Sequence, residues 1–215
     1  MAEPAAPPGR VALAVLISGR GSNMAAIARA AAAPDYPARI VLVAADRRHA
    51  PGLEIARTLG LPTTVVPHRD FATRQAFEEA LDGVLRAARA ELVALAGFLR
   101  VLTPWFVGRW RGRILNIHPS LLPRHPGLNP HARAIDAGDS ESGCTVHEVT
   151  EGVDAGPILA QARVPVLPDD TPERLAARVL AEEHRLYPLA IADFVRHRLQ
   201  RAGPREEPPR GALAL

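Results

Sequence analysis

Two polar side chains stand at the end of a short apolar segment, and their types suit proton transfer. Asn116 and His118 open the stretch Asn-Ile-His-Pro-Ser-Leu-Leu-Pro, which ends at Pro123. Residues two apart in an extended segment project to the same face. An amide donor beside an imidazole can stabilise an oxyanion and exchange a proton, so we interpret the pair as a candidate catalytic centre. The alternative is a loop that ends a strand and holds a hydrogen-bonded histidine.

A second candidate site is the segment Ser18-Gly19-Arg20-Gly21-Ser22-Asn23, directly after an apolar run. Glycine permits close approach of the backbone, and successive amides at a helix start form an anion cradle. Met24 occupies the third glycine position of the dinucleotide fingerprint, and no Gly-Lys-Ser/Thr sequence follows. The segment therefore predicts a phosphate site, with a tight strand-to-helix turn as the alternative.

Other candidate residues give weaker signals. Asp154 lies in a loop between Gly152 and Gly156, where an aspartate most often caps a turn. The spacing of His118, His125 and His131 fits no usual zinc pattern, so we expect no functional metal. We interpret Cys144, the single cysteine, as a small core residue.

Composition and charge limit the class of protein. The 215 residues are 47% hydrophobic, which is enough for a sizeable core. All 26 basic residues are arginine, yet the last twenty residues carry the whole net charge of +3, which leaves the body neutral. That distribution argues against a nucleic-acid partner. The apolar runs are too short to cross a membrane, no secretory signal is evident, and we expect a cytoplasmic protein.

Strand and helix patterns alternate through the first half of the chain, which predicts a parallel, doubly wound α/β sheet. Ligands bind such sheets outside the carboxyl ends of the strands, which here are Ser18–Asn23, Gly97–Arg100 and His118–Pro123. After residue 140, two strands joined by a loop predict an antiparallel extension, and a long helix capped by Thr171 follows. The predicted strands are Val11–Ile17, Ile40–Ala45, Pro62–Val66, Leu92–Ala96, Ile114–Ile117, Gly143–Thr150 and Ile158–Val166, and the helices are Asn23–Ala33, Pro51–Leu59, Arg74–Arg89, Pro104–Trp110 and Thr171–Arg198. We expect one domain over residues 11–200, a disordered segment over 1–10 and a Pro/Arg-rich tail over 201–215.

The order of these motifs resembles a known family. The glycine loop, Ala96–Arg100, Asn116–Pro123, the Asp154 loop and Glu182–Pro188 occur here in the order found in the folate-dependent phosphoribosylglycinamide formyltransferases of purine biosynthesis. The resemblance covers Val11 to Phe194. It implies a Rossmann-like formyltransferase fold, and an enzyme that moves a formyl group from 10-formyltetrahydrofolate to the amine of glycinamide ribonucleotide. It implies small-molecule substrates, no metal, no nucleic-acid or membrane partner, and a monomer or homodimer.

The resemblance also implies roles for single residues. Asn116, His118 and Asp154 would form the catalytic trio. Glu183 and the loop Gly21, Ser22 and Asn23 would bind the ribonucleotide and its phosphate. The folate would contact Arg74, Leu99, Arg100, Val101, Leu102, Asn116, Thr150, Glu151, Gly152 and Val153. Bacterial relatives often carry histidine at the position of Asn129, so any contribution from that histidine is missing here.

Several alternatives remain open from the sequence. Formyltetrahydrofolate hydrolase shares the trio but normally carries an N-terminal regulatory domain, and only ten residues precede the first predicted strand. Methionyl-tRNA formyltransferase shares the Asn-x-His-x-Ser-Leu-Leu-Pro segment but carries a further C-terminal domain. Sugar-nucleotide formyltransferases have extra segments that we do not find. A non-enzymatic nucleotide-binding module would explain the glycine loop and leave the trio unexplained.

Overall fold

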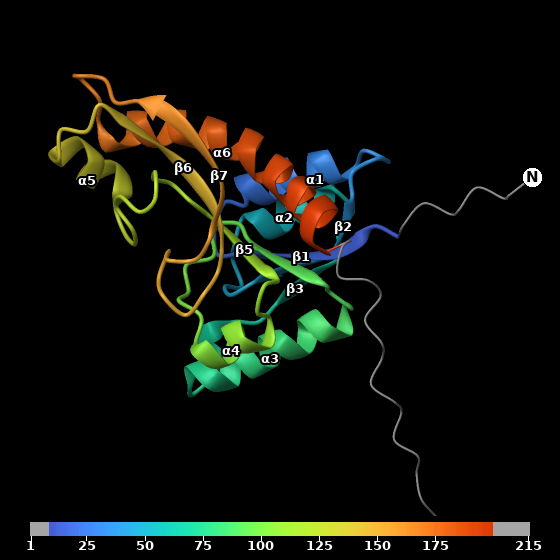
Figure 1. Cartoon of the computed structure of the whole chain (residues 1–215). Helices are drawn as coiled ribbons and strands as arrows, with labels where there is room; N and C mark the ends of the chain where they lie inside the picture. The colour runs from blue at the N-terminus through green and yellow to red at the C-terminus, as the bar shows by residue number, and fades with distance from the viewer. Residues whose placement is uncertain (1–8, 200–215) are drawn as a thin grey trace, which may run out of the picture.

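The computed structural model describes residues 9–199, and the elements follow the predicted alternation of strand and helix (Figure 1). The expectations for residues 1–8 and for the tail 201–215 lie outside the described residues. The strands are β1 (Val11–Ile17), β2 (Ala38–Ala45), β3 (Thr63–Val65), β4 (Leu92–Leu95), β5 (Ile114–His118), β6 (Glu141–Glu148) and β7 (Ile158–Pro165). The helices are α1 (Ser22–Ala31), α2 (Gly52–Thr58), α3 (Arg74–Ala87), α4 (Pro104–Arg109), α5 (Pro130–Asp136) and α6 (Pro172–Phe194), with a 3₁₀ turn η1 (His68–Asp70) and a π-helical turn η2 (Val195–Leu199).

The seven strands form one sheet in the order β3-β2-β1-β4-β5-β6-β7. The first five pair in parallel, and β6 and β7 pair antiparallel. The strand order reverses between β1 and β4, which is the switch point where open α/β sheets bind ligands. The predicted doubly wound, mainly parallel sheet with an antiparallel C-terminal extension is confirmed.

Helices cover both faces of the sheet, and β1 shows why its sequence is apolar throughout. Leu13, Val15 and Ile17 pack into one buried cluster with residues of α1, α2 and α6. Ala14 and Leu16 point to the other face and pack with residues of α3 and α4. A strand buried on both faces needs no polar position, so its sequence is a continuous apolar run. Figure 1 shows α3 and α4 on the side of the sheet opposite α1 and α6.

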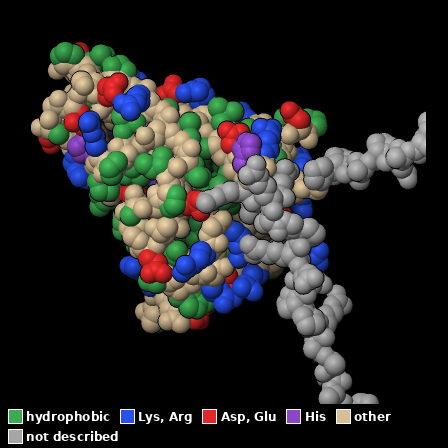
Figure 2. Space-filling model, viewed as in Figure 1, with side chains coloured by type: hydrophobic (Ala, Val, Ile, Leu, Met, Phe, Trp, Pro, Cys, Tyr) green, Lys and Arg blue, Asp and Glu red, His purple; other side chains and the backbone are tan. Residues whose placement is uncertain are grey.

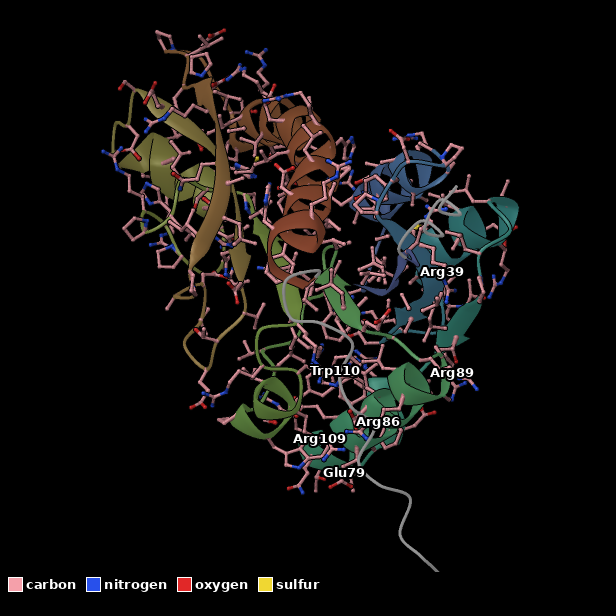
Figure 3. All side chains as sticks on the ribbon, turned by 45° about the vertical axis from the view of Figure 1, so that its right-hand side comes forward. Arg39, Glu79, Arg86, Arg89, Arg109 and Trp110 are labelled. Carbon is pink, nitrogen blue, oxygen red and sulfur yellow. The ribbon has the colours of Figure 1, made fainter. Side chains whose placement is uncertain are left out.

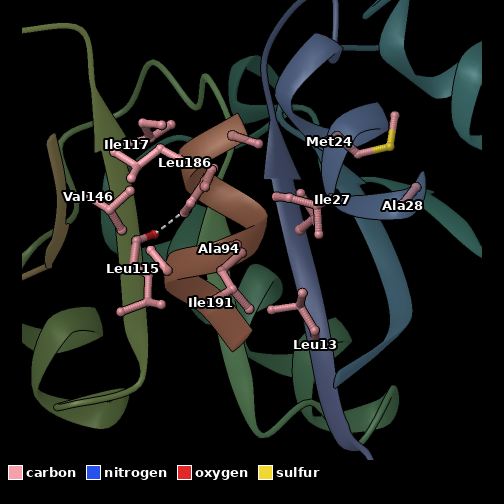
Figure 4. Close-up of a cluster of buried hydrophobic side chains, with 14 of the residues drawn as sticks. Leu13, Met24, Ile27, Ala28, Ala94, Leu115, Ile117, Val146, Leu186 and Ile191 are labelled. Carbon is pink, nitrogen blue, oxygen red and sulfur yellow. Dashed lines mark hydrogen bonds between the residues drawn. The ribbon is translucent and has the colours of Figure 1, made fainter. Parts of the chain in front are cut away.

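The long helix α6 connects the parallel and antiparallel parts of the sheet. It packs on α1, β6 and β7, and Figure 4 shows Leu186 and Ile191 on this helix between β5 and β1. The buried Tyr187 hydroxyl lies 2.9 Å from the carbonyl oxygen of Leu115, near the start of β5, and 3.1 Å from that of Leu95, at the end of β4. The hydroxyl of Thr171 caps the helix at the Arg174 amide, as its position predicts. The helix continues through Pro188, which the sequence marks as a potential kink.

Two short elements were not predicted. Helix α5 has only seven residues, with Pro130 at its start and Asn129 in the left-handed conformation before it. The 3₁₀ turn η1 has three residues. Neither is long enough to give a helical repeat in the sequence.

The surface in Figure 2 mixes charged and apolar side chains, and several arginines lie at the lower end of this face, where Figure 1 places α3 and α4. Within residues 9–199, no helix combines the length and the hydropathy that a membrane crossing requires.

Candidate active site

A cavity of about 500 Å³ opens at the carboxyl ends of β4 and β5 and collects most of the predicted site residues. Asn23 and Glu183 lie in its lining together with all three members of the predicted trio. The lining also includes the segment 97–102 after β4 and the segment 149–154 after β6. The residues predicted for the folate that line the cavity are Leu99, Arg100, Val101, Leu102, Asn116, Thr150, Glu151, Gly152 and Val153. Three predicted residues, Gly21, Ser22 and Arg74, are absent from the lining, and Arg74 is exposed at the start of α3.

The centre of the cavity is an imidazole between two oxygen acceptors. The Nδ1 atom of His118 lies 3.3 Å from Oδ2 of Asp154. Its Nε2 atom lies 3.0 Å from the carbonyl oxygen of His125. A doubly protonated ring can donate to both acceptors, and an imidazolium of this kind has a proton that it can give to a substrate. His118 is buried, so few waters compete for these contacts.

The carboxylate of Asp154 is held by its own loop and by its neighbours. Asp154 has a left-handed backbone with φ of 51°, and its Oδ2 accepts the Gly127 amide at 2.8 Å. Burial favours the neutral acid, but the hydrogen bonds from His147 and the Gly127 amide and the charges of the two imidazoles outweigh it and lower the pKa of Asp154. Asp154 is therefore ionised at neutral pH.

His147 is a site residue that the sequence analysis missed. It lies on β6 directly opposite Asn116 on β5. Its Nδ1 lies 2.9 Å from the Glu148 carbonyl oxygen and donates to it, and its Nε2 lies 3.1 Å from the side-chain nitrogen of Asn116. The same Nε2 lies 3.6 Å from Oδ1 of Asp154. His147 thus contacts two members of the trio and orients both.

A buried pair lies on the other side of the cavity. The Asn23 side-chain amide donates to Oε2 of Glu183 at 2.7 Å, which joins the start of α1 to α6. Burial raises the pKa of Glu183, and the Asn23 bond opposes that change. Gly21 precedes α1 with φ of 72°, and a Cβ there would lie 2.7 Å from the Gly52 Cα. Glycine is therefore required at position 21 by packing, independently of any ligand.

Arg100 is anchored from beneath the cavity. Its Nε lies 3.1 Å from Oδ2 of Asp46, whose side chain is fully buried. His68 Nδ1 lies 3.3 Å from the same oxygen. Asp46 follows β2, so the carboxyl ends of β2 and β4 are joined by this ion pair. The arrangement fixes the segment after β4 that lines the cavity.

Comparison with known proteins identifies the family. Residues 11–191 match the family described as formyl transferase. The chain belongs to this family. It is 43% identical over 188 residues to the phosphoribosylglycinamide formyltransferase of Haemophilus influenzae, a match that covers 87% of this chain and 89% of the relative. It is 48% identical to the trifunctional purine biosynthetic protein adenosine-3 of Drosophila melanogaster, but it spans only 14% of that protein's length.

Solved structures of the formyl transferase family support the fold assignment. The crystal structure of phosphoribosylglycinamide formyltransferase from Brucella melitensis is 53% identical, with a TM-score of 0.83, and the match covers 86% of this chain and 96% of that one. The glycinamide ribonucleotide transformylase 1 of Symbiobacterium toebii is 45% identical, with a TM-score of 0.87 and coverage of 89% and 91%. The Rossmann-like formyltransferase fold expected from the motifs is confirmed.

Proposed function

We propose that this chain transfers the formyl group of 10-formyltetrahydrofolate to the amine of 5′-phosphoribosylglycinamide in purine biosynthesis. The observation that carries the proposal is that one cavity is lined both by Asn116, His118 and Asp154 and by the Asn23–Glu183 pair. One end of that cavity offers proton-transfer groups and the other a polar pair at a helix start. The names of the bacterial relatives that the chain matches over most of their length support this substrate.

In this proposal each wall of the cavity receives one substrate. The loop Gly21–Asn23 binds the phosphate, and Glu183 contacts the ribose and glycinamide. The pterin lies between 99–102 and 150–153, where apolar side chains such as Leu102 and Val153 contribute to the lining. Arg74, exposed at the start of α3, contacts the distal part of the folate.

The chemistry follows from the groups at the centre. Attack of the amine on the formyl carbon forms a tetrahedral centre with an oxyanion, which the Asn116 amide and the protonated His118 stabilise. The attacking nitrogen then loses a proton and the folate N10 gains one before it leaves. His118 supplies the proton to N10, and the buried Asp154 carboxylate stabilises the imidazolium and orders a water that relays the proton. No covalent intermediate with the protein is required.

Exclusion of water is part of the same proposal. Hydrolysis of the formyl donor competes with transfer, and a closed cavity suppresses it. Leu99, Val101, Leu128 and Val153 are exposed apolar side chains around the cavity. Bound folate covers these side chains and displaces water from the reacting centre.

We place the activity in the cytoplasm of the cell, with a monomer or homodimer as the acting form and no nucleic-acid or membrane partner.

A transfer assay with three acceptors tests the proposal. The purified chain is given 10-formyltetrahydrofolate with phosphoribosylglycinamide, with its dephosphorylated form, or with water alone. We expect rapid formylation of the first, weak formylation of the second and little hydrolysis. Asp154→Asn keeps the shape of the side chain and removes its charge, so it serves as the matched variant and is expected to lose kcat with little change in KM. Hydrolysis as fast as transfer would support formyltetrahydrofolate hydrolase instead.

A further inference from the structure

A second cavity lies at the amino ends of the strands, opposite the candidate active site at their carboxyl ends, and most of its lining residues are arginines. It has a volume of about 330 Å³ and is lined by Arg86, Arg89, Ala90, Trp110 and Arg113. Arg89 and Arg113 each come shortly before a strand, β4 and β5 respectively, so the cavity lies where these strands begin. Figure 3 shows Arg86, Arg89 and Trp110 on this side of the molecule, near α3 and α4.

Two of the three arginines in the lining are held in place before any ligand arrives. The Arg113 guanidinium lies 4.7 Å from the centre of the Trp110 ring, and its Nη2 donates to the Arg109 carbonyl at 2.8 Å. The Arg86 Nε donates to Oδ2 of Asp82 at 3.0 Å. Held side chains lose less conformational entropy when they bind a ligand, which favours binding.

The acidic groups nearby do not neutralise the lining. Asp82 is buried beneath it and accepts from Arg86, Arg109 and the Trp110 ring nitrogen, so one carboxylate is shared by two guanidinium groups. None of the described residues that line the cavity carries a carboxylate.

Among the three arginines of the lining, Arg89 is the one whose guanidinium has no bonded partner among the described residues. It follows α3 in the left-handed conformation with φ of 53°. Within residues 9–199, no hydrogen bond or ion pair engages its guanidinium. A left-handed backbone at a residue other than glycine is uncommon, and here it occurs at a cavity wall. The position offers a free guanidinium fork to an incoming anion.

We propose that this cavity is a binding site for the phosphoryl group of a small phosphorylated metabolite, separate from the candidate active site. Arginine forks match phosphate oxygens with paired hydrogen bonds, and three of them face one space here. The volume is near the lower limit of ligand pockets, which suits a phosphate with a compact sugar. The Trp110 ring and Ala90 supply the apolar part of the wall.

Trp110 supplies the readout for a test, because its ring contacts Arg113 in the lining. The chain has two tryptophans, and Trp105→Phe leaves Trp110 as the single emitter. That variant is titrated with inorganic phosphate, ribose 5-phosphate and ribose while tryptophan emission is recorded. We expect saturable changes with both phosphate compounds, at least as strong an affinity for ribose 5-phosphate, none with ribose, and weaker binding at high salt. A response to inorganic phosphate alone would overturn the assignment to a metabolite.

Two arginine variants decide whether the signal arises in this cavity. Arg89→Gln removes a charge that pairs with none of residues 9–199, and we expect about tenfold weaker binding, which equals about 1.4 kcal/mol. Arg57→Gln, an equal change of charge on α2 outside the lining, is expected to leave affinity unchanged. Calorimetry on the unmodified chain repeats the comparison without the Trp105 change. No saturable response, or a titration that Arg89→Gln leaves unaltered, would overturn the proposal, and neither result bears on formyl transfer.

Discussion

Gly156 approaches the backbone of Glu148 so closely that no residue with a Cβ atom fits there, and this approach fixes the position of the Asp154 loop. A Cβ at Gly156 would lie 1.8 Å from the Glu148 carbonyl oxygen, whereas ordinary contacts begin near 3.4 Å. That oxygen is the partner of His147 Nδ1. In Gly156→Ala either the loop or the end of β6 must therefore move until the distance has nearly doubled.

The size of the effect follows from this movement. The loop carries Asp154 and the end of β6 carries His147, so the movement disturbs the contact of Asp154 with His118, at 3.3 Å, or with His147, at 3.6 Å. A misplacement of about 1 Å in a catalytic constellation costs roughly 100-fold in rate, and we expect at least that loss of kcat. Overpacking of this kind costs about 1–3 kcal/mol of stability. The melting temperature should then fall by about 2–12 °C for a domain of this size.

The assay compares kcat and the melting temperature of Gly156→Ala with those of Gly83→Ala. Gly83 lies on α3, and a Cβ there would meet nothing within 4 Å. Alanine at that position should stabilise the helix by about 0.5–1 kcal/mol and leave kcat unchanged. A folded Gly156→Ala protein with the turnover of the parent chain would refute the argument that this close approach positions Asp154.

Three further predictions concern single side chains. His118→Ala should reduce turnover by about 10²–10⁴-fold with little change in melting temperature, and a steady-state formyl-transfer assay that finds normal turnover would contradict the proposed acid. Glu183→Gln should unfold at a higher temperature than the parent chain at pH 8. Burial raises the pKa of Glu183, so its negative charge opposes folding once the pH rises through that pKa. The difference in melting temperature should vanish at a pH well below 4.5, the ordinary pKa of glutamate, where the side chain is neutral in both states. Tyr187→Phe should lower stability by about 1–3 kcal/mol in urea melts, because the Leu95 and Leu115 carbonyls lose their buried donor, and an unchanged midpoint would show that water replaces it.

The parts of the fold that the sequence predicts are those encoded locally. The bounds of β1 match the predicted Val11–Ile17 because burial on both faces leaves a run of apolar residues with sharp ends. Helix α5 escaped prediction because a left-handed Asn129 and Pro130 start it and only seven residues form it. Its presence depends on the loop that enters it rather than on a repeat along the chain.

The candidate site also has some residues that local sequence predicts and others whose position depends on tertiary structure. Asn116 and His118 are recognisable because they occupy alternate positions of one strand. His147 is not, because its place opposite Asn116 depends on how β6 aligns with β5, and no pattern within one strand states that alignment. Asp154 was singled out by family resemblance, since a carboxylate in a glycine loop is common. Its left-handed backbone and its contact with the Gly127 amide are tertiary features.

Because the contacts of the trio depend on how β5 aligns with β6, catalytic activity also reports whether a molecule folded with the correct alignment of these two strands. Side chains alternate between the faces of a strand, so a slip of one residue would turn His147 to the opposite face and bring Val146 against Asn116. A molecule trapped in that state would keep the pairing of the parallel strands, would turn Cys144 and Val146 out of the buried cluster on one face of the sheet, and would lack the contacts that orient the trio. During refolding, the far-ultraviolet circular dichroism signal would recover when the parallel strands form. Turnover would return only in molecules in which β6 pairs with β5 in the correct alignment.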